Sequence, residues 1–291
     1  MMLRWIVNNW VRKMARDKVH DSVARAARDS MRGGGQTARE EENPPVDNAP
    51  CRILVVFAMG VEAGGMVDLL QNVVTTQGST FLEHSGFLGE QRVALIESGI
   101  GRDLAGRATA DAVSVHQPEW IISAGFAGAL SSELKRGHIL MASHLVDLAD
   151  SKLDVGLQMD SESLSRNPAL HTGRLLTVDE LIRTPSEKRK LAKQYDAVAC
   201  DMETTAVGKV CSREKVRFLS VRIISDAVDD ELPQEIGKLL DQKSLAAKLG
   251  AATGAILGRP SSIKDMWGLR EEAIRASDRL SRFLAGVIRN L

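Results

Sequence analysis

The sequence predicts an α/β protein, built as a three-layer α/β/α sandwich around a central mixed, largely parallel sheet. Short apolar runs rich in Val and Ile recur from residue 52 onward, and such runs are typical of strands that are covered on both faces. Segments with the apolar spacing of helices lie between several of these runs. This alternation of the two element types indicates an α/β domain.

These elements are expected within one domain, residues 51–291. Its strands are expected at 53–57, 93–97, 120–124, 139–142, 197–199 and 216–224. Its helices are expected at 66–74, 104–116, 186–194 and 204–214, followed by an extended C-terminal pair at 235–257 and about 265–291. The break between the last two helices falls at Gly258-Arg259-Pro260, because proline ends a helix.

A basic amphipathic helix is predicted for residues 1–31, in which Lys and Arg outnumber Asp. Two interpretations stay open. The helix could make a peripheral membrane contact, with Trp5 and Trp10 among the lipid headgroups, or it could be a solvated helix that packs loosely on the domain. Residues 32–50 combine three consecutive glycines with a polar, proline-containing run, which predicts a flexible linker.

Composition excludes several classes of protein. The chain has 291 residues, of which 44% are hydrophobic and 26% charged, so a disordered or fibrous protein is not expected. Lys plus Arg and Asp plus Glu both number 38, so nucleic acid is not an expected partner. The cysteines at 51, 200 and 211 are too few and too widely spaced for a disulfide framework or a zinc site. A cytoplasmic protein without metal or cofactor is expected, and no apolar stretch reaches the 18 residues of a spanning helix.

Three acidic residues follow predicted strands: Glu62, Glu203 and Asp226. Open α/β sheets bind ligands at the carboxyl ends of their strands. The three carboxylates are therefore expected to converge on a polar small molecule. Taken singly, each is also explained as a residue that caps or begins a helix.

Glycines at the strand ends do not form a nucleotide-binding motif. Gly99-Ile100-Gly101 begins a G-x-G-x-x-G pattern, but its third glycine would fall at Leu104. No G-K-[ST] sequence occurs, so a phosphate-binding P-loop is absent. The two glycines instead predict a tight turn from strand to helix.

Five short motifs occur in an order that characterises one family. They are Ala58-Met59-x-x-Glu62, Ser98-Gly99-Ile100-Gly101, Ala124-Gly125-x-Ala127-Gly128, Met202-Glu203 and Ile224-Ser225-Asp226. In this order they resemble the nucleoside phosphorylase and nucleosidase superfamily. The likeness is greatest to methylthioadenosine/S-adenosylhomocysteine nucleosidases and to hopanoid-associated phosphorylase-like proteins. It runs from about residue 51 to residue 230.

The resemblance implies a role for each matching residue. Asp226 matches the general acid that protonates N7 of the departing purine, and Ser225 matches the residue that orients it. Such an acid must hold its proton near neutral pH, which burial favours. Glu203 matches the carboxylate that binds the ribose hydroxyls and favours the oxocarbenium charge, with Met202 beneath the sugar. Glu62 matches the residue that activates water.

The remaining substrate-binding positions implied by the resemblance are Met59, Phe126, Ala127 and Ile182, of which Ile182 matches the position whose backbone binds the purine edge. Phe126 departs from the family pattern, because many relatives carry a small or hydroxylated residue there. A phenyl ring cannot bind phosphate, so hydrolysis is favoured over phosphorolysis. The adenine-stacking aromatic residue of typical nucleosidases is replaced by Leu181.

The sequence therefore predicts a purine nucleosidase that acts on a methylthioadenosine-like, S-adenosylhomocysteine-like or lipid-linked adenosine and gives the free base and a ribosyl product. Two alternatives stay open. Arg102 and Arg107 could supply the anion contacts of a phosphate-dependent phosphorylase. Phe126 and Leu181 could mark a nucleoside-binding module without turnover. The resemblance also implies a homodimer.

Overall fold

The computed structural model describes residues 51–157, 167–233 and 261–291, with the backbone alone for 261–270. Of these, residues 51–157, 167–233 and 267–291 belong to one compact unit. The predicted helices at 1–31 and 235–257 and the predicted linker at 32–50 lie outside the described residues, so they stay predictions.

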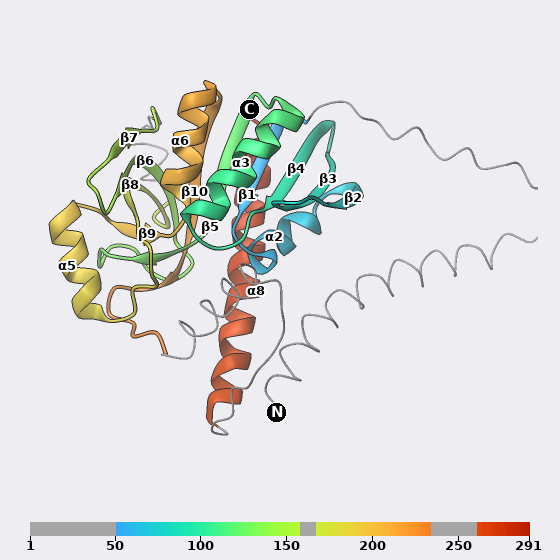
Figure 1. The fold of residues 1–291 in the computed structure, drawn as a ribbon. Helices are drawn as coiled ribbons and strands as arrows, with labels where there is room; N and C mark the ends of the chain where they lie inside the picture. Colours follow the sequence, from blue (N-terminus) through green and yellow to red (C-terminus); the bar gives the residue numbers. More distant parts are fainter. Residues whose placement is uncertain (1–50, 158–166, 234–260) are drawn as a thin grey trace, which may run out of the picture. The chain divides into compact units, whose positions relative to one another are not determined.

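Ten strands form a single mixed sheet within the described residues. In chain order they are β1 Ile53–Phe57, β2 Gln71–Gln77, β3 Leu82–Leu88, β4 Gln91–Glu97, β5 Trp120–Ala129, β6 Ile139–Asp147, β7 Lys152–Asp154, β8 Leu170–Thr177, β9 Ala199–Asp201 and β10 Arg217–Asp226. Strand β1 runs parallel to both β4 and β5, and β5 runs parallel to β10. The prediction of a mixed sheet is confirmed (Figure 1).

Part of the sheet closes on itself. Strand β5 pairs with β9 on one side and is parallel to β10, and β10 pairs with β6. Strands β6, β8 and β9 complete the ring. The parallel strands β1 and β4 and the antiparallel β3 and β2 extend from β5 as an open wing. The closed part brings the carboxyl ends of β5, β9 and β10 close together, because β5 is bonded to both of the others.

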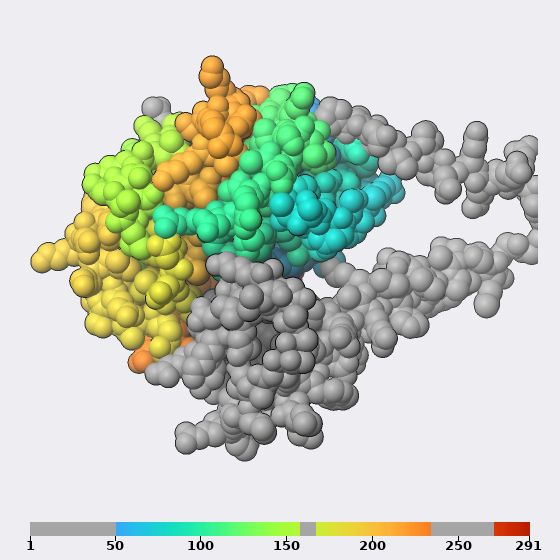
Figure 2. Space-filling view, viewed as in Figure 1, coloured from blue at the N-terminus to red at the C-terminus, as the bar shows by residue number. Residues whose placement is uncertain are grey.

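Five helices lie beside this sheet in the described part of the chain. They are α2 Gly60–Val67, α3 Arg102–His116, α5 Pro185–Tyr195, α6 Thr204–Glu214 and α8 Ser261–Ile288. Helices α3 and α6 contact each other, and Figure 2 shows them side by side in green and orange. A capping box begins α5, where the Thr184 hydroxyl accepts from the Glu187 amide and the Glu187 carboxylate accepts from the Thr184 amide. None of the described helices has the length and apolar composition that a membrane crossing requires.

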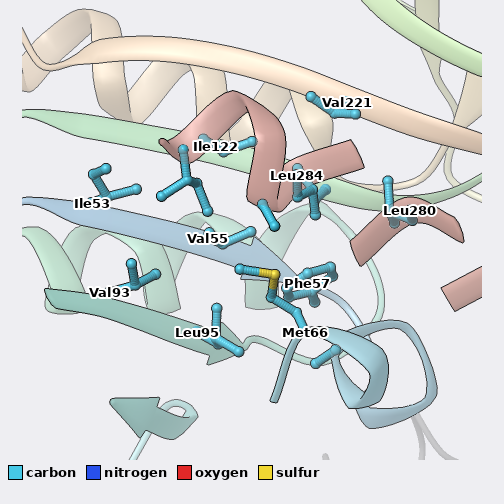
Figure 3. Packing of buried hydrophobic residues seen from close by; sticks show 14 of the residues in the cluster. Ile53, Val55, Phe57, Met66, Val93, Leu95, Ile122, Val221, Leu280 and Leu284 are labelled. Atoms are coloured by element: carbon cyan, nitrogen blue, oxygen red, sulfur yellow. The ribbon is translucent and has the colours of Figure 1, made fainter. Parts of the chain in front are cut away.

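The two faces of β1 show how the layers are held. Ile53, Val55 and Phe57 point to one face, where they pack with Met66 of α2 and Leu280 of α8 (Figure 3). The alternate residues of β1 point to the other face and pack with α3 and α6. Apolar side chains on both faces are what a strand between two helical layers needs. The three-layer prediction is confirmed.

One predicted helix is wrong. The sequence analysis expects a helix at 66–74, whereas α2 ends at Val67 and residues Gln71–Gln77 form β2. Val73 and Val74 are followed by two threonines, and this β-branched run favours a strand over a helix. Strands β3, β7 and β8 were not predicted, and β9 begins two residues after the expected start at 197.

Candidate active site

A cavity of about 650 Å³ lies at the carboxyl ends of β1, β5, β9 and β10. Helix α8 supplies part of its wall. The cavity is lined by all nine residues that the sequence analysis assigns to the site: Met59, Glu62, Phe126, Ala127, Ile182, Met202, Glu203, Ser225 and Asp226. The structure therefore brings these nine residues together on the wall of one cavity.

Glu62 is held in one orientation by backbone amides. Its Oε2 accepts from the amides of Ala58 at 3.0 Å and Met59 at 2.9 Å, and its Oε1 accepts from the Phe126 amide at 2.8 Å. Burial raises the pKa of Glu62 above its ordinary value, while the Phe126 amide and the charge of Arg222 act in the opposite direction. A buried, oriented carboxylate of raised pKa is suited to take a proton from water.

The backbone at residue 125 approaches Glu62 closely, which explains why this residue is a glycine. Gly125 has φ of +154°, and a Cβ built on it would lie 2.7 Å from Glu62 Oε1 and 2.8 Å from Nη1 of Arg222. No larger residue fits there without moving the carboxylate. The glycine of the Ala124-Gly125-x-Ala127-Gly128 motif thus serves the position of Glu62.

Glu203 lies just before α6 and accepts from the Gly101 amide at 2.8 Å. Burial, with the charges of Asp201 and Glu62 added, raises the pKa of Glu203 to about 8. The positive φ of Gly101, +98°, belongs to the turn that presents this amide. The turn predicted at Gly99-Ile100-Gly101 therefore also positions Glu203, through the Gly101 amide.

Asp226 ends β10 and is buried. Its Oδ1 accepts from the hydroxyl of Ser225 at 2.6 Å, as the resemblance implies. Its Oδ2 accepts from Nζ of Lys188 at 2.5 Å. The buried carboxyl group of Asp226 therefore contacts both a hydroxyl and an ammonium group. The contact of Lys188 with Asp226 could not be predicted from the sequence, because a lysine in a charged helix is normally exposed.

A second buried ion pair supports the cavity wall, and the sequence analysis missed it as well. Nη2 of Arg222 donates to Asp201 Oδ2 at 2.8 Å, to Ser123 Oγ at 2.7 Å and to Thr204 Oγ1 at 2.6 Å. The charge of Arg222 also opposes the rise in the pKa of Glu62 and Glu203 that burial causes. One signal could have identified this ion pair: Arg222 lies within the strand predicted at 216–224, just before a family motif. An arginine in a buried strand needs an acidic partner, since an unpaired buried charge is very costly.

The rest of the lining is largely apolar. Met59, Phe126, Ile182 and Met202 are four of the apolar side chains that line the cavity, and Phe126 also packs against the core. Such walls bury a flat, weakly polar group such as a nucleobase while a few polar groups fix its orientation. Among the described side chains, no group of three His, Cys or acidic residues is suited to hold a metal ion.

The two arginines that suggested phosphate binding lie elsewhere. Arg102 forms ion pairs with Asp179 and, at 4.0 Å, with Asp147. Arg107 lines a neighbouring cavity of about 550 Å³, and neither arginine lines the cavity that holds the three carboxylates. These positions weaken the argument for an anion site built on Arg102 and Arg107.

Curated relatives share the sequence pattern over most of their length. The 5′-methylthioadenosine/S-adenosylhomocysteine nucleosidase of Buchnera aphidicola is 27% identical over 215 residues, which are 67% of this chain and 92% of that protein. The protein of the same name from Shewanella piezotolerans is 27% identical over 221 residues, 68% of this chain and 96% of its own.

Solved structures share the fold. The Neisseria meningitidis 5′-methylthioadenosine/S-adenosylhomocysteine nucleosidase, in complex with methylthio-immucillin-A, superposes with a TM-score of 0.61 at 20% identity, covering 82% of this chain and 99% of that one. The native futalosine hydrolase of Helicobacter pylori gives a TM-score of 0.60 at 19% identity, covering 83% of this chain and 98% of that one. A family model described as the phosphorylase superfamily matches residues 52–157 and 148–253. With most of the sequence matched, the chain belongs to the phosphorylase superfamily.

Proposed function

We propose that the chain is a purine nucleosidase, which uses water to break the N-glycosidic bond of an adenosine-type nucleoside and gives the free base and a ribosyl product. The observation that carries the proposal is the presence of Glu62, Glu203 and Asp226 on the wall of one cavity. The names of the relatives from Buchnera and Shewanella support the same activity. The proposed reaction needs no cofactor.

Asp226 acts as the general acid in this proposal. Departure of a purine leaves negative charge on the base, and a proton delivered to N7 converts a poor leaving group into a neutral one. The hydroxyl of Ser225, 2.6 Å from Asp226 Oδ1, fixes the rotation of the carboxyl group. Ile182 contributes to the wall beside the base.

Glu62 and Glu203 act on the sugar side. Glu62 takes a proton from the attacking water, and its three amide contacts hold it for this step. Glu203 binds ribose hydroxyls above Met202 and interacts with the positive charge that develops on the ring. A neutral Glu203 binds a hydroxyl as donor or acceptor, whereas an ionised Glu203 also stabilises the oxocarbenium charge.

Hydrolysis is preferred to phosphorolysis because Glu62 lies on the side of the cavity from which the nucleophile would attack the sugar. A carboxylate that activates water repels a phosphate nucleophile, and Phe126 offers no hydroxyl to bind one. Arg102 pairs with Asp179, and Arg107 lines the neighbouring cavity. Arg279 does line the cavity, so phosphate is included as an arm of the test.

The test measures release of free base from methylthioadenosine, S-adenosylhomocysteine and adenosine, each with and without phosphate. We expect release without phosphate, and we expect Asp226→Asn to lower the rate by about 100- to 10,000-fold while nucleoside binding persists. Release that requires phosphate would instead mean a phosphorylase. Binding without release would mean a nucleoside-binding module, and normal turnover by Asp226→Asn would remove Asp226 from the role of acid.

The 5′ substituent of the substrate, the homodimer and the cytoplasmic location are also proposals. Methylthioadenosine and S-adenosylhomocysteine come first as substrates because the relatives' names contain them. A lipid-linked adenosine rests on the predicted helix at 1–31. Vesicle flotation of the full chain beside a chain that starts at Cys51 tests that contact, and equal flotation would contradict it.

A further inference from the structure

Lys188 is a buried lysine in the first part of α5, with no exposed surface. Its Nζ donates to Asp226 Oδ2 at 2.5 Å, to the Ala227 carbonyl at 2.8 Å and to the Asp230 carbonyl at 2.9 Å. An ammonium group has three N–H donors, and all three are in use. The side chain is therefore held as a cation, and its charge is balanced by Asp226.

Two of the three contacts that Lys188 makes do not require its charge. Two of its three acceptors are backbone carbonyls, and an amide side chain could hold both. Burial of an ammonium carries a large desolvation penalty. Only the contact with Asp226 uses the charge itself.

Other ionisable groups around Asp226 are oriented elsewhere. Arg136, before β6, pairs with the Asp230 carboxylate at 2.7 Å. That carboxylate also accepts from the Ala227 amide at 2.6 Å. Asp201 on β9 pairs with Arg222. The Cys200 thiol of β9 is neutral, since burial and the charges of Asp226 and Asp201 raise its pKa. Among these groups, Lys188 is the cation in direct contact with Asp226.

We propose that Lys188 is a positioning residue that stabilises the carboxylate which Asp226 becomes when it gives up its proton. This inference rests on the proposed function. In the step, the Asp226 O–H bond breaks and the proton forms a bond to N7 of the base. The C1′–N9 bond breaks with its electron pair going to the base, and water, deprotonated by Glu62, forms the new C1′–O bond. The Asp226 carboxylate then accepts the Lys188 N–H.

The ion pair in the free protein is, on this account, the state after proton delivery. Exchange with solvent returns a proton to Asp226 and removes one from Glu62, so the protons balance over one turnover. The Lys188 ammonium, in contact with Asp226 Oδ2, stabilises the negative charge that this carboxyl group carries once its proton has gone to the leaving group.

The test is the pH profile of kcat/KM for base release by Lys188→Gln, whose amide keeps two donors and loses the charge. We expect the alkaline limb to move to higher pH by about one to three pH units, the usual effect of removing an adjacent opposite charge. The plateau rate should fall about tenfold or more because the acid is weaker. Lys188→Arg, which keeps the cation, should retain the alkaline limb of the parent protein. Lys193→Gln, on the exposed part of α5, is the matched control and should change neither.

A second substrate separates this role from a structural one. The second substrate is a 4-nitrophenyl β-ribofuranoside, whose leaving group departs as nitrophenolate and needs no proton at N7. Lys188→Gln should therefore retain most of the parent rate on this substrate. Equal losses on both substrates, or an unmoved alkaline limb, would overturn the inference. If Lys188→Gln does not fold, Lys188→Arg alone decides, since an altered limb in a folded Arg variant contradicts the proposal. Absence of base release by the parent protein would instead mean that the proposed function fails.

Discussion

Replacing Glu203 by glutamine should make the protein more stable at alkaline pH. Glutamine keeps an oxygen that can accept from the Gly101 amide, now at 2.8 Å. It removes the negative charge that burial, Asp201 and Glu62 all oppose. The substitution therefore imitates the protonated form of Glu203 at every pH.

The magnitude follows from the pKa of Glu203, which is raised from 4.5 to about 8. Between these two values the native state holds a proton that the unfolded state has released. Stability from this group is therefore complete below pH 4.5 and is lost as the pH rises through 8. At about 1.36 kcal/mol per pH unit, the parent protein loses up to about 5 kcal/mol across this window, and Glu203→Gln loses none of it.

Urea unfolding at pH 5 and at pH 9 measures the effect. The free energy of unfolding of Glu203→Gln minus that of the parent should rise by several kcal/mol between the two pH values. The comparison does not depend on any constant effect of the substitution, because that effect cancels. A difference that stays the same at both pH values would show that Glu203 does not hold a proton in the native protein, and would refute the reasoning.

Three further substitutions test other parts of the account. Met66→Ala removes a fully buried side chain between β1 and α8 and should lower the free energy of unfolding by about 2–5 kcal/mol in denaturant titrations. Ser277→Ala removes the hydroxyl that donates to the Glu62 carbonyl and accepts from the Gly65 amide. It should cost about 1–3 kcal/mol, and an unchanged midpoint would mean that water replaces the hydroxyl. Gly125→Ala places a Cβ 2.7 Å from Glu62 Oε1, so base release should fall at least about tenfold, and full activity would contradict the role given to Glu62.

Local patterns in the sequence were enough for the central elements. The apolar run at Ile53–Phe57 is β1 and the helical pattern at Thr204–Glu214 is α6, both with the expected ends. Strand β1 is buried at every position, and α6 buries one face while its other face is exposed, so burial fixes the pattern of apolar residues in both. The local sequence pattern did not predict β2. All of its residues are exposed, so burial imposes no alternation of apolar and polar side chains.

Long-range features could not be derived in this way. Closure of the sheet through the β5–β10 and β10–β6 pairs depends on registers between segments that lie far apart in the chain. The motifs contain eight of the nine cavity residues, all except Ile182, since each motif is itself local. Lys188 was missed for the opposite reason, as its contact with Asp226 joins α5 to the end of β10 and no short segment contains both.

The most direct test of the central claim is hydrolysis of methylthioadenosine in water enriched in ¹⁸O. If water is the nucleophile, each sugar product carries one ¹⁸O at C1′, free base appears in equal amount, and added phosphate changes neither. Asp226→Asn should form almost none of either product. A sugar 1-phosphate without ¹⁸O, or labelled sugar formed equally fast by Asp226→Asn, would contradict the account.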